Sequence, residues 1–256
     1  MTDPAARQPS LTVVIPAYNE SHRIAETVRQ VAAHLADQPY PADIIVVDDG
    51  STDTTARTAR RAAADAAVPC HIIEITHAGK AAALRAGMIT ATGDQIAFSD
   101  ADLATPLHHL ADLRAAIARG CDVAIGSREG PGALRLGEPE YRHFMGRAFN
   151  TFVRLLLLPG IDDTQCGFKL FTADAVRAIL PRTRLYRDAQ EITGARVTAY
   201  DVELLVIARQ RHLRICSVPV TWVYGVGSKV RPVADSWHNA QDVMAIWRNA
   251  KRGSYR

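Results

Sequence analysis

The sequence predicts a single α/β domain, in which helices cover both faces of a mostly parallel central sheet. In the first half, short apolar segments rich in β-branched residues alternate with longer segments of helical spacing. The apolar segments carry no polar alternation, which is typical of strands that are buried on both faces. The chain has 256 residues, of which 48% are hydrophobic and 22% charged, and these values suit one folded core.

The expected elements follow from this alternation. Strands are expected at residues 11–15, 44–47, 70–75, 96–98 and 123–125. Helices are expected at residues 20–35, 52–66, 81–90 and 106–118. We see no repeat and no linker, so we expect a flexible N-terminus at 1–10, one domain at 11–235, and a C-terminal amphipathic helix and tail at 236–256.

Polar motifs follow each of the five expected strands. They occupy residues 16–20, 48–51, 79–80, 100–102 and 126–128. Ligands of open parallel sheets bind outside the carboxyl ends of the strands, so we expect these motifs to form one site. Each motif also has a structural alternative, as a turn, a helix cap or a solvated surface loop.

Asp100 and Asp102 flank one small residue directly after an apolar segment. Two carboxylates at this spacing suit a hard cation, Mg²⁺ or Mn²⁺, which binds together with substrate phosphates. The same residues can end a strand, and Thr105-Pro106 can begin the next helix. The two interpretations are compatible.

Three other motifs suit a nucleotide. Tyr18 can stack on a planar ring, Glu20 and Asp48 can accept hydrogen bonds from a base or ribose, and Lys80 at a helix start can meet a phosphate. The sequence contains neither a GxGxxG nor a GxxxxGK[ST] motif, which argues against a dinucleotide fingerprint and a Walker ATPase.

Composition limits the compartment and the partners. The four cysteines, at 70, 121, 166 and 216, show no CxxC spacing, so we expect buried, reduced thiols and no structural zinc. The first ten residues lack the apolar core of a signal peptide, and the longest apolar run, 155–158, is too short to span a bilayer, so a cytoplasmic location is expected. A net charge of +3 and 6% aromatic residues argue against nucleic acid, and nothing in the pattern sets an oligomeric state.

Residues 141–158 form an amphipathic helix pattern with Phe144, Ala148, Phe152 and Leu155 on one stripe. This helix either covers the core or lies on a membrane surface. Residues 237–247, with Trp237 and Trp247, raise the same question. Five arginines between 128 and 154 predict a local anionic partner.

Together these motifs resemble the family-2 inverting glycosyltransferases of GT-A fold. The motifs that carry this resemblance are VIPAYNE (14–20), VVDDGSTD (46–53), GK (79–80) and DAD (100–102). The dolichyl- or polyprenyl-phosphate glucosyltransferase branch is resembled by GSR (126–128), DTQCGFKLF (163–171), YDVELL (200–205), VPVTW (218–222) and GSKV (227–230). The match runs from about Leu11 to Trp247.

The resemblance implies roles by position. The nucleotide-sugar pocket would include Pro16, Ala17, Tyr18, Glu20, Asp48, Lys80, Asp100, Ala101 and Gln165. Asp102 and Asp100 would hold Mg²⁺ or Mn²⁺. The catalytic group would be Asp201, Arg128 and Lys169, with Glu203 in the same acidic motif as Asp201. Arg142 and Arg147 would hold the acceptor phosphate.

The implied activity is metal-dependent transfer of glucose from UDP-glucose to a polyprenyl phosphate on the inner, cytoplasmic face of the plasma membrane, where the enzyme would bind peripherally to anionic lipid. The alternatives are a soluble transferase with a small or protein-linked hydroxyl acceptor, which needs Asp201 as a base, mannosyl transfer from GDP-mannose, and a non-catalytic binding module. Two features depart from the family pattern: an N-terminal membrane helix is not found, and residues 181–199 are longer and more polar than expected. That segment would be either an acceptor loop that orders on binding or a surface insertion.

Overall fold

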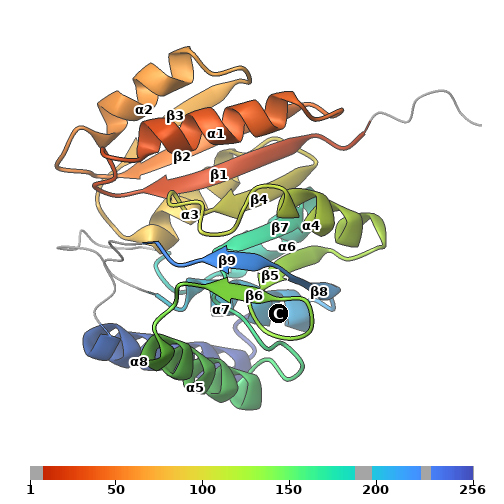
Figure 1. The fold of residues 1–256 in the computed structure, drawn as a ribbon. Helices are drawn as coiled ribbons and strands as arrows, with labels where there is room; N and C mark the ends of the chain where they lie inside the picture. Colours follow the sequence, from red (N-terminus) through yellow and green to blue (C-terminus); the bar gives the residue numbers. More distant parts are fainter. Residues whose placement is uncertain (1–7, 188–197, 226–231, 256) are drawn as a thin grey trace, which may run out of the picture.

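A seven-stranded sheet forms the centre of the molecule (Figure 1). The computed structural model describes residues 8–187, 198–225 and 232–255, without the side chains of residues 142 and 232–237. The strands of the sheet are β1 (Leu11–Ala17), β2 (Ala42–Asp49), β3 (Cys70–Ile75), β4 (Gln95–Ser99), β5 (Val123–Ser127), β7 (Phe168–Thr172) and β8 (Ile215–Pro219). Their order is β3-β2-β1-β4-β7-β5-β8, and only β7 runs antiparallel to its neighbours. The predicted α/β architecture with a mostly parallel sheet is confirmed.

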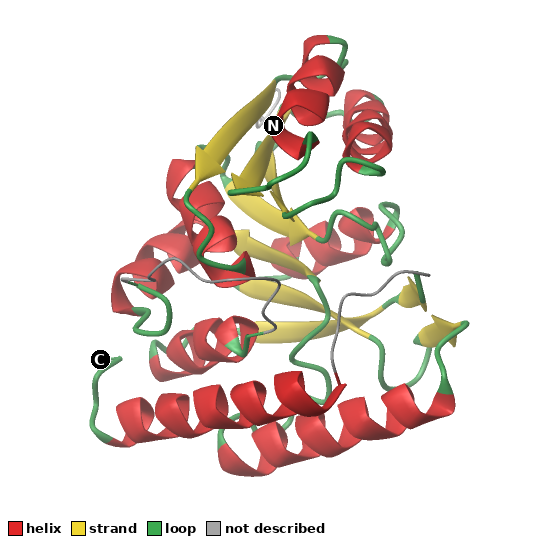
Figure 2. Cartoon of the chain, turned by 90° about the vertical axis from the view of Figure 1, so that its left-hand side faces the viewer, coloured by secondary structure: helices red, strands yellow, loops and turns green. Residues whose placement is uncertain are grey.

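Helices cover both faces of this sheet (Figure 2). The helices are α1 (Ile24–Ala36), α2 (Thr55–Ala64), α3 (Lys80–Thr90), α4 (His109–Ala118), α5 (Glu140–Leu156), α6 (Ala173–Ile179), α7 (Tyr200–Gln210) and α8 (Pro232–Lys251), with a 3₁₀ turn at Leu180–Arg182. One core layer joins the sheet to α1, α2 and α4, and the other joins it to α3 and α5–α8. Alternate residues of β1 supply the two layers, Val13 to the first and Val14 to the second.

All five predicted strands are present, and β1 and β2 are each longer than expected. Helices α1 and α2 begin later than expected, because the residues before them belong to loops that are bonded to each other. Two short strands, β6 (Leu134–Leu136) and β9 (Thr221–Val223), form a separate parallel pair beside the main sheet (Figure 1).

The expectation of four reduced cysteines is wrong, because Cys121 and Cys216 form a disulfide with a Cα–Cα distance of 6.1 Å. The spacing of these two cysteines along the sequence gives no indication of this contact. Strands β5 and β8 run parallel with Val123 opposite Ile215, which brings the two cysteines together across the edge of the sheet. Cys70 and Cys166 remain free thiols. The cysteine argument for a reducing compartment therefore fails for this pair.

The predicted apolar stripe of α5 does not cover the core. Phe144 is 74% exposed and Leu155 is 80% exposed, while Val153 on the opposite side of the helix is buried. Among the described residues, no helix has both the length and the apolar character that crossing a bilayer requires.

The C-terminal helix behaves differently from α5. Val243 and Ile246 are fully buried in the core layer that contains α7, and the side chain of Trp237 lies outside the described residues. In both ribbon views α8 and α5 lie side by side at the β8 end of the sheet (Figures 1 and 2). Among the described side chains of these two helices, the exposed large apolar ones belong to α5.

Candidate active site

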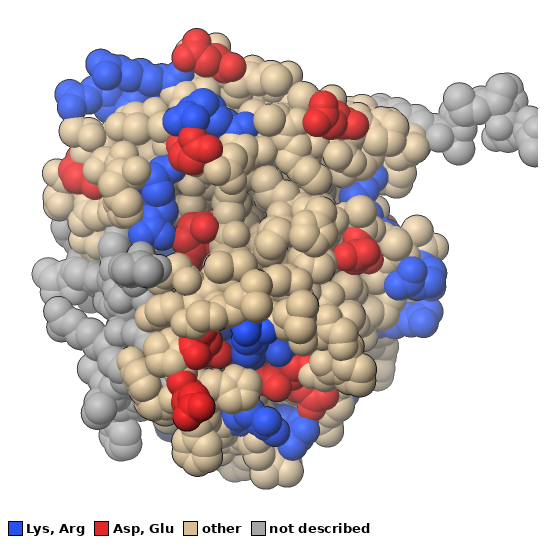
Figure 3. All heavy atoms as spheres, viewed as in Figure 1, with Lys and Arg blue, Asp and Glu red and all other residues tan. Residues whose placement is uncertain are grey.

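The five polar motifs meet at one edge of the sheet, as predicted. They follow β1, β2, β3, β4 and β5, whose carboxyl ends all lie on the same side because these strands are parallel. Figure 3 shows acidic and basic side chains interspersed over the face of the molecule that it presents, without a large patch of one sign. The chemistry of the site therefore depends on individual contacts rather than on a broad field.

The loops after β1 and β2 are joined by hydrogen bonds. The Asn19 side chain accepts the backbone N–H of Thr52 at 2.9 Å, and the hydroxyl of Ser51 accepts the backbone N–H of Asn19 at 2.9 Å. Asn19 adopts φ +53°, in the left-handed region that asparagine tolerates better than most residues. These contacts hold the two loops together, and they thereby fix Tyr18 in the first loop and Asp48 near the end of β2.

The two neighbouring aspartates of β2 have different surroundings. Asp49 accepts the backbone N–H groups of Ala78 and Gly79 at 2.8 and 2.9 Å, so it holds the loop that leads into α3. Burial raises its pKa, and these contacts oppose that shift. Asp48 accepts the N–H of Ser51 with Oδ2, whereas its buried Oδ1 has no hydrogen-bond partner within the described structure. Asp48 therefore has a spare acceptor at the sheet edge.

Tyr18 stacks flat on His77, with ring centroids 3.9 Å apart. The imidazole Nδ1 of His77 lies 2.8 Å from Asp49 Oδ2, which keeps the ring in place. Glu20 forms an ion pair with Arg23 at 2.9 Å. The tyrosine predicted to stack on a base is thus positioned by a second aromatic ring.

Asp100, Asp102 and Lys80 form a compact charged group after β3 and β4. Lys80 Nζ lies 2.5 Å from Asp100 Oδ1. Burial lowers the pKa of Lys80, but the carboxylates of Asp100, Asp201 and Asp102 more than offset that effect and raise it. Burial and the neighbouring Asp100 charge raise the pKa of Asp102. Two carboxylates that repel each other in this way favour a cation between them.

Gly167 makes room for Asp100. A Cβ atom at position 167 would lie 2.1 Å from Asp100 Oδ2, so no side chain fits there while the carboxylate keeps its place. A glycine in the DTQCGFKLF string is therefore needed for the aspartate pair, although the two positions are far apart in the sequence.

The aspartate pair fits a divalent cation that is completed by its substrate. Among the described residues, no group of three or more His, Cys, Asp or Glu side chains is arranged to hold a metal. Asp100 and Asp102 supply hard oxygen donors, and Mg²⁺ commonly takes one or two carboxylates together with water and substrate phosphates. The raised pKa of Asp102 and the cradle at Gly167 agree with this fit.

Asp201 and Lys169 meet beside this group. Lys169 on β7 is fully buried, and its Nζ lies 3.0 Å from Asp201 Oδ2 at the start of α7. Lys169 also donates to the carbonyl of Cys166. The predicted catalytic residues Asp201 and Lys169 are therefore together, whereas Glu203 points away from them into the core, where it is fully buried.

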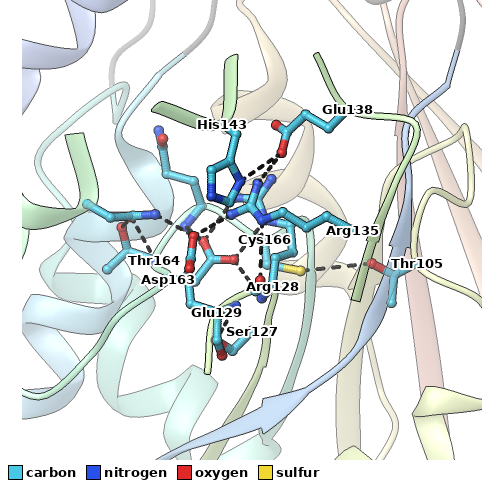
Figure 4. Close-up of polar contacts among 12 residues, drawn as sticks. Thr105, Ser127, Arg128, Glu129, Arg135, Glu138, His143, Asp163, Thr164 and Cys166 are labelled. Atoms are coloured by element: carbon cyan, nitrogen blue, oxygen red, sulfur yellow. Dashed lines mark hydrogen bonds and ion pairs between the residues drawn. The ribbon is translucent and has the colours of Figure 1, made fainter. Parts of the chain in front are cut away.

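Arg128 binds Asp163 in a two-pronged ion pair (Figure 4). Arg128 Nε lies 2.7 Å from Asp163 Oδ2, and a terminal guanidinium nitrogen lies 2.9 Å from Oδ1. Burial would raise the pKa of Asp163, but the Arg128 guanidinium holds it well below its ordinary value. The guanidinium also lies over the ring of Trp222, 5.4 Å from its centroid. Arg128 is thus oriented by Asp163, a residue to which the sequence alone gave no role.

Two other arginines of this region, Arg135 and Arg154, also have partners within the protein. Arg135 bridges Glu129 and Glu138 at 2.8 and 2.7 Å (Figure 4). Arg154 pairs with Asp162 at 2.7 Å. The expected local anion is therefore supplied in part by the protein's own carboxylates. Arg128, Arg135 and Arg154 are therefore not free members of a basic patch.

Arg147 is exposed on α5 and lines a polar cavity of about 270 Å³. The other lining residues are Glu129, Gly130, Asn150, Thr151, Arg154 and Asp162. Arg142 also lies on α5, but its side chain is outside the described residues. The predicted role of both arginines at the acceptor phosphate stays a prediction.

The remaining predicted residues lie along the same edge. Pro16 and Ala17 end β1 opposite Val47 and Asp48, and Gln165 donates its backbone N–H to Asp163 Oδ1 at 3.2 Å. The carbonyl of Ala101 accepts the Thr27 hydroxyl at 2.6 Å, which anchors the aspartate loop to α1. Residues 188–197 of the predicted acceptor loop lie outside the described residues.

Comparison with known proteins agrees with this geometry. A sequence model described as "Glycosyl transferase family 2" matches residues 12–180. The chain is 35% identical to Dolichyl-phosphate beta-glucosyltransferase ALG5C of Trichomonas vaginalis over 82% of its own length, but it spans only 63% of that relative. It is 31% identical to Dolichyl-phosphate beta-glucosyltransferase of Drosophila melanogaster, covering 96% of this chain and 77% of the relative.

A solved structure shares the fold. It is glucosyl-3-phosphoglycerate synthase from Mycobacterium tuberculosis in complex with Mn²⁺, uridine-diphosphate-glucose and phosphoglyceric acid. The TM-score is 0.66 at 18% identity, over 94% of this chain and 80% of that one.

Proposed function

The chain belongs to glycosyltransferase family 2, and on that premise we propose that it transfers glucose from UDP-glucose to a polyprenyl phosphate at the cytoplasmic face of the membrane, with Mg²⁺ or Mn²⁺. The observation that carries this proposal is the charged group of Asp100, Asp102 and Lys80 at the shared sheet edge. The group combines two carboxylates, which are hard oxygen donors for a metal ion, with the positively charged Lys80. This combination suits a sugar nucleotide that is bound through its diphosphate.

The donor would bind over the loops after β1–β4. The unpartnered Oδ1 of Asp48 suits the ring N–H of a uracil, and the Tyr18 ring, backed by His77, suits a planar base. Asp100 and Asp102 would hold the cation, which stabilises the negative charge that develops on the leaving diphosphate. Lys80 would contact the same phosphates, in line with the carboxylates that keep it charged.

The acceptor would approach beside Asp201 and Lys169. A phosphate monoester is already ionised at neutral pH, so its oxygen can attack the sugar without a general base. Asp201 would then orient the acceptor through its contact with Lys169 rather than remove a proton. A single displacement inverts the anomeric carbon, so an α-linked donor would give a β-linked product.

The membrane contact is assigned to α5. The exposed Tyr141, Phe144, Phe152 and Leu155 lie along one side of this helix, and the exposed Arg147 flanks them. An apolar stripe beside a basic residue suits an anionic bilayer, from which the lipid acceptor would reach the site. The C-terminal tail is not assigned this role, because its Val243 and Ile246 are buried.

A donor and acceptor screen tests this function. The protein is incubated with UDP-glucose, GDP-mannose and other sugar nucleotides, with Mg²⁺ or Mn²⁺, and with a polyprenyl phosphate. We expect a β-linked lipid glucose from UDP-glucose that disappears with a chelator. The absence of transfer from every donor, or transfer only to water-soluble hydroxyl acceptors, would refute the proposal. Sedimentation with anionic liposomes is the matched test of location, and complete absence from the pellet would favour a soluble enzyme.

A further inference from the structure

Two buried carboxylates lie outside the site described above. Glu203 on α7 is fully buried, and Asp242 on α8 is 7% exposed. A carboxylate is costly to bury unless it accepts several hydrogen bonds. Neither residue faces the donor edge, so the contacts that they satisfy indicate what they do.

Glu203 holds one flank of the segment that precedes α7. Its carboxylate accepts the backbone N–H of Arg184 at 2.8 Å and that of Leu185 at 3.0 Å. It also accepts the phenol O–H of Tyr255 at 2.8 Å, and Tyr255 is itself fully buried. One side chain therefore joins α7 to residues 184–185 and to the C-terminal tail.

Asp242 joins both flanks of the same segment. Its Oδ2 accepts the phenol O–H of Tyr186 at 2.7 Å and the backbone N–H of Ala199 at 3.0 Å. These two donors stand on either side of residues 187–198. A single oxygen on α8 thus binds Tyr186 and Ala199, the described residues that flank this segment in the sequence.

This arrangement reaches the candidate catalytic residue through α7. Ala199 directly precedes α7, and Asp201 stands in its first turn with its carboxylate on Lys169. Residues two positions apart on a helix point in nearly opposite directions. Glu203 therefore anchors the inner side of α7 while Asp201 faces the site.

We propose that Glu203 and Asp242 form a carboxylate clasp that fixes the position of α7. Because Asp201 lies on α7, the clasp also holds Asp201 where it orients the acceptor for attack on the donor sugar. The clasp consists of these two side chains with their donors in residues 184–186, Ala199 and Tyr255. Both residues are positioning residues, and the C-terminal tail is part of the clasp. This inference rests on the proposed transferase function, because it assigns Asp201 to that reaction.

The test compares two substitutions at one position. In Asp242→Asn the amide oxygen can accept both hydrogen bonds that Oδ2 accepts, whereas in Asp242→Ala both are lost. Tyr255→Phe removes a single donor with no change of shape. Asp174→Ala is the matched control, because Asp174 is an exposed carboxylate on α6 that pairs with Arg177.

Kinetics separate positioning from general structure. For Asp242→Ala we expect kcat to fall about tenfold or more while the KM for UDP-glucose stays unchanged, since small misplacements of reacting groups are costly. Asp242→Asn should stay within about threefold of wild type, because its acceptor contacts are kept. Tyr255→Phe should lower kcat in the same direction, and Asp174→Ala should leave it unchanged. An equal fall in kcat in Asp242→Asn and Asp242→Ala, or a changed KM for UDP-glucose with unchanged kcat, would overturn the clasp.

Hydrogen exchange gives a readout that does not need activity. In Asp242→Ala, exchange should speed up in peptides covering residues 184–187 and 199–203 together, and not in peptides covering β1 or β2. Faster exchange on one flank only, or everywhere, would overturn the clasp. If wild type proves inactive but the two flanks still respond together, the proposed function fails while the coupling of the flanks stands.

Discussion

The loops after β1–β4 and the surfaces around α5, α7 and α8 hold their polar side chains in different ways. In the loops, each residue is held by a neighbouring loop, as Asn19 is by the Thr52 backbone, and a spare acceptor remains on Asp48. Around α7 and α8 the buried carboxylates of Glu203 and Asp242 each accept several hydrogen bonds, and they join segments that are far apart in the sequence, as Glu203 does with Tyr255. We call the first region the donor edge and the second the acceptor side.

This difference indicates that the two regions have separate roles. The donor edge keeps unused oxygens and like charges close together, which favours binding of a cation and a polar ligand at some cost in stability. The acceptor side combines an exposed apolar stripe on α5 with the buried carboxylates of the proposed clasp, Glu203 and Asp242. Changes at the donor edge should therefore affect chemistry first, and changes at the acceptor side should affect stability and orientation.

The largest effect is expected at the aspartate pair. Asp102→Asn removes a hard oxygen donor and should lower metal-dependent transfer by about a thousandfold or more. The melting temperature should stay level or rise, because burial and the Asp100 charge disfavour the Asp102 carboxylate. Activity assays with a thermal melt measure both. Asp174→Asn is the exposed control, and wild-type transfer in Asp102→Asn would contradict the assignment.

The disulfide tests whether the two regions are separable in stability. Replacing both Cys121 and Cys216 by serine should lower the free energy of unfolding by about 3 to 4 kcal/mol, because the bond closes a long loop. Nucleotide binding should be unchanged, since the pair lies across β5 and β8. Denaturant unfolding and UDP titration measure the two quantities. A loss of UDP affinity in the double variant would show that the donor edge depends on the disulfide across β5 and β8.

The pH dependence of stability belongs to the acceptor side. Burial raises the pKa of Glu203 to about 7 from 4.5, and the Asp242 charge adds to that shift, while the amides of Arg184 and Leu185 and the Tyr255 hydroxyl oppose it. The folded protein therefore holds this proton up to a higher pH than the unfolded chain does. The protonated Glu203 side chain therefore adds about 3 kcal/mol to the free energy of unfolding below pH 4.5. This contribution is lost as pH rises to about 7.

Glu203→Gln removes that titration. Denaturant unfolding at several pH values should give a difference between wild type and Glu203→Gln that changes between pH 4.5 and 7 and is constant above. Parallel curves through that window would show that Glu203 does not titrate there.

The smallest of these effects is expected where the two regions meet. Gly167→Ala would push a methyl group into the Asp100 carboxylate, and transfer should fall by about 30-fold to 100-fold as the aspartate moves. Gly146→Ala is the matched control, because a Cβ there has open space around it. Equal activity of the two alanine variants would show that the position of Asp100 does not limit transfer.

The donor edge was largely predictable from the sequence, and the acceptor side was not. Hydrophobic periodicity located β1–β5 but not β7 and β8, and the parallel arrangement brought Asp48, Lys80, Asp100 and Asp102 to one edge as expected. The pairing of Arg128 with Asp163 depends on where the connection after α5 returns to the sheet. The disulfide depends on the register of β8 against β5. Periodicity reports local structure and contains neither kind of information.

Amphipathic patterns were ambiguous in the same way. The stripe of α5 and the apolar residues of α8 look alike in sequence, yet Leu155 is exposed and Ile246 is buried. The choice depends on which helix packs against α7, and that is a tertiary contact. Glu203 was grouped with Asp201 by motif, but its place two residues along the helix turns it toward the tail.

If the donor edge and the acceptor side work separately, a change on the outer face of α5 should affect use of the acceptor without affecting donor binding. UDP-glucose affinity and glucose transfer to polyprenyl phosphate in anionic vesicles are measured for wild type and for a variant carrying both Phe144→Asp and Leu155→Asp. We predict unchanged UDP-glucose affinity with loss of most transfer to the vesicle-borne acceptor. Full transfer in that variant, or a parallel loss of donor affinity, would contradict this separation of roles.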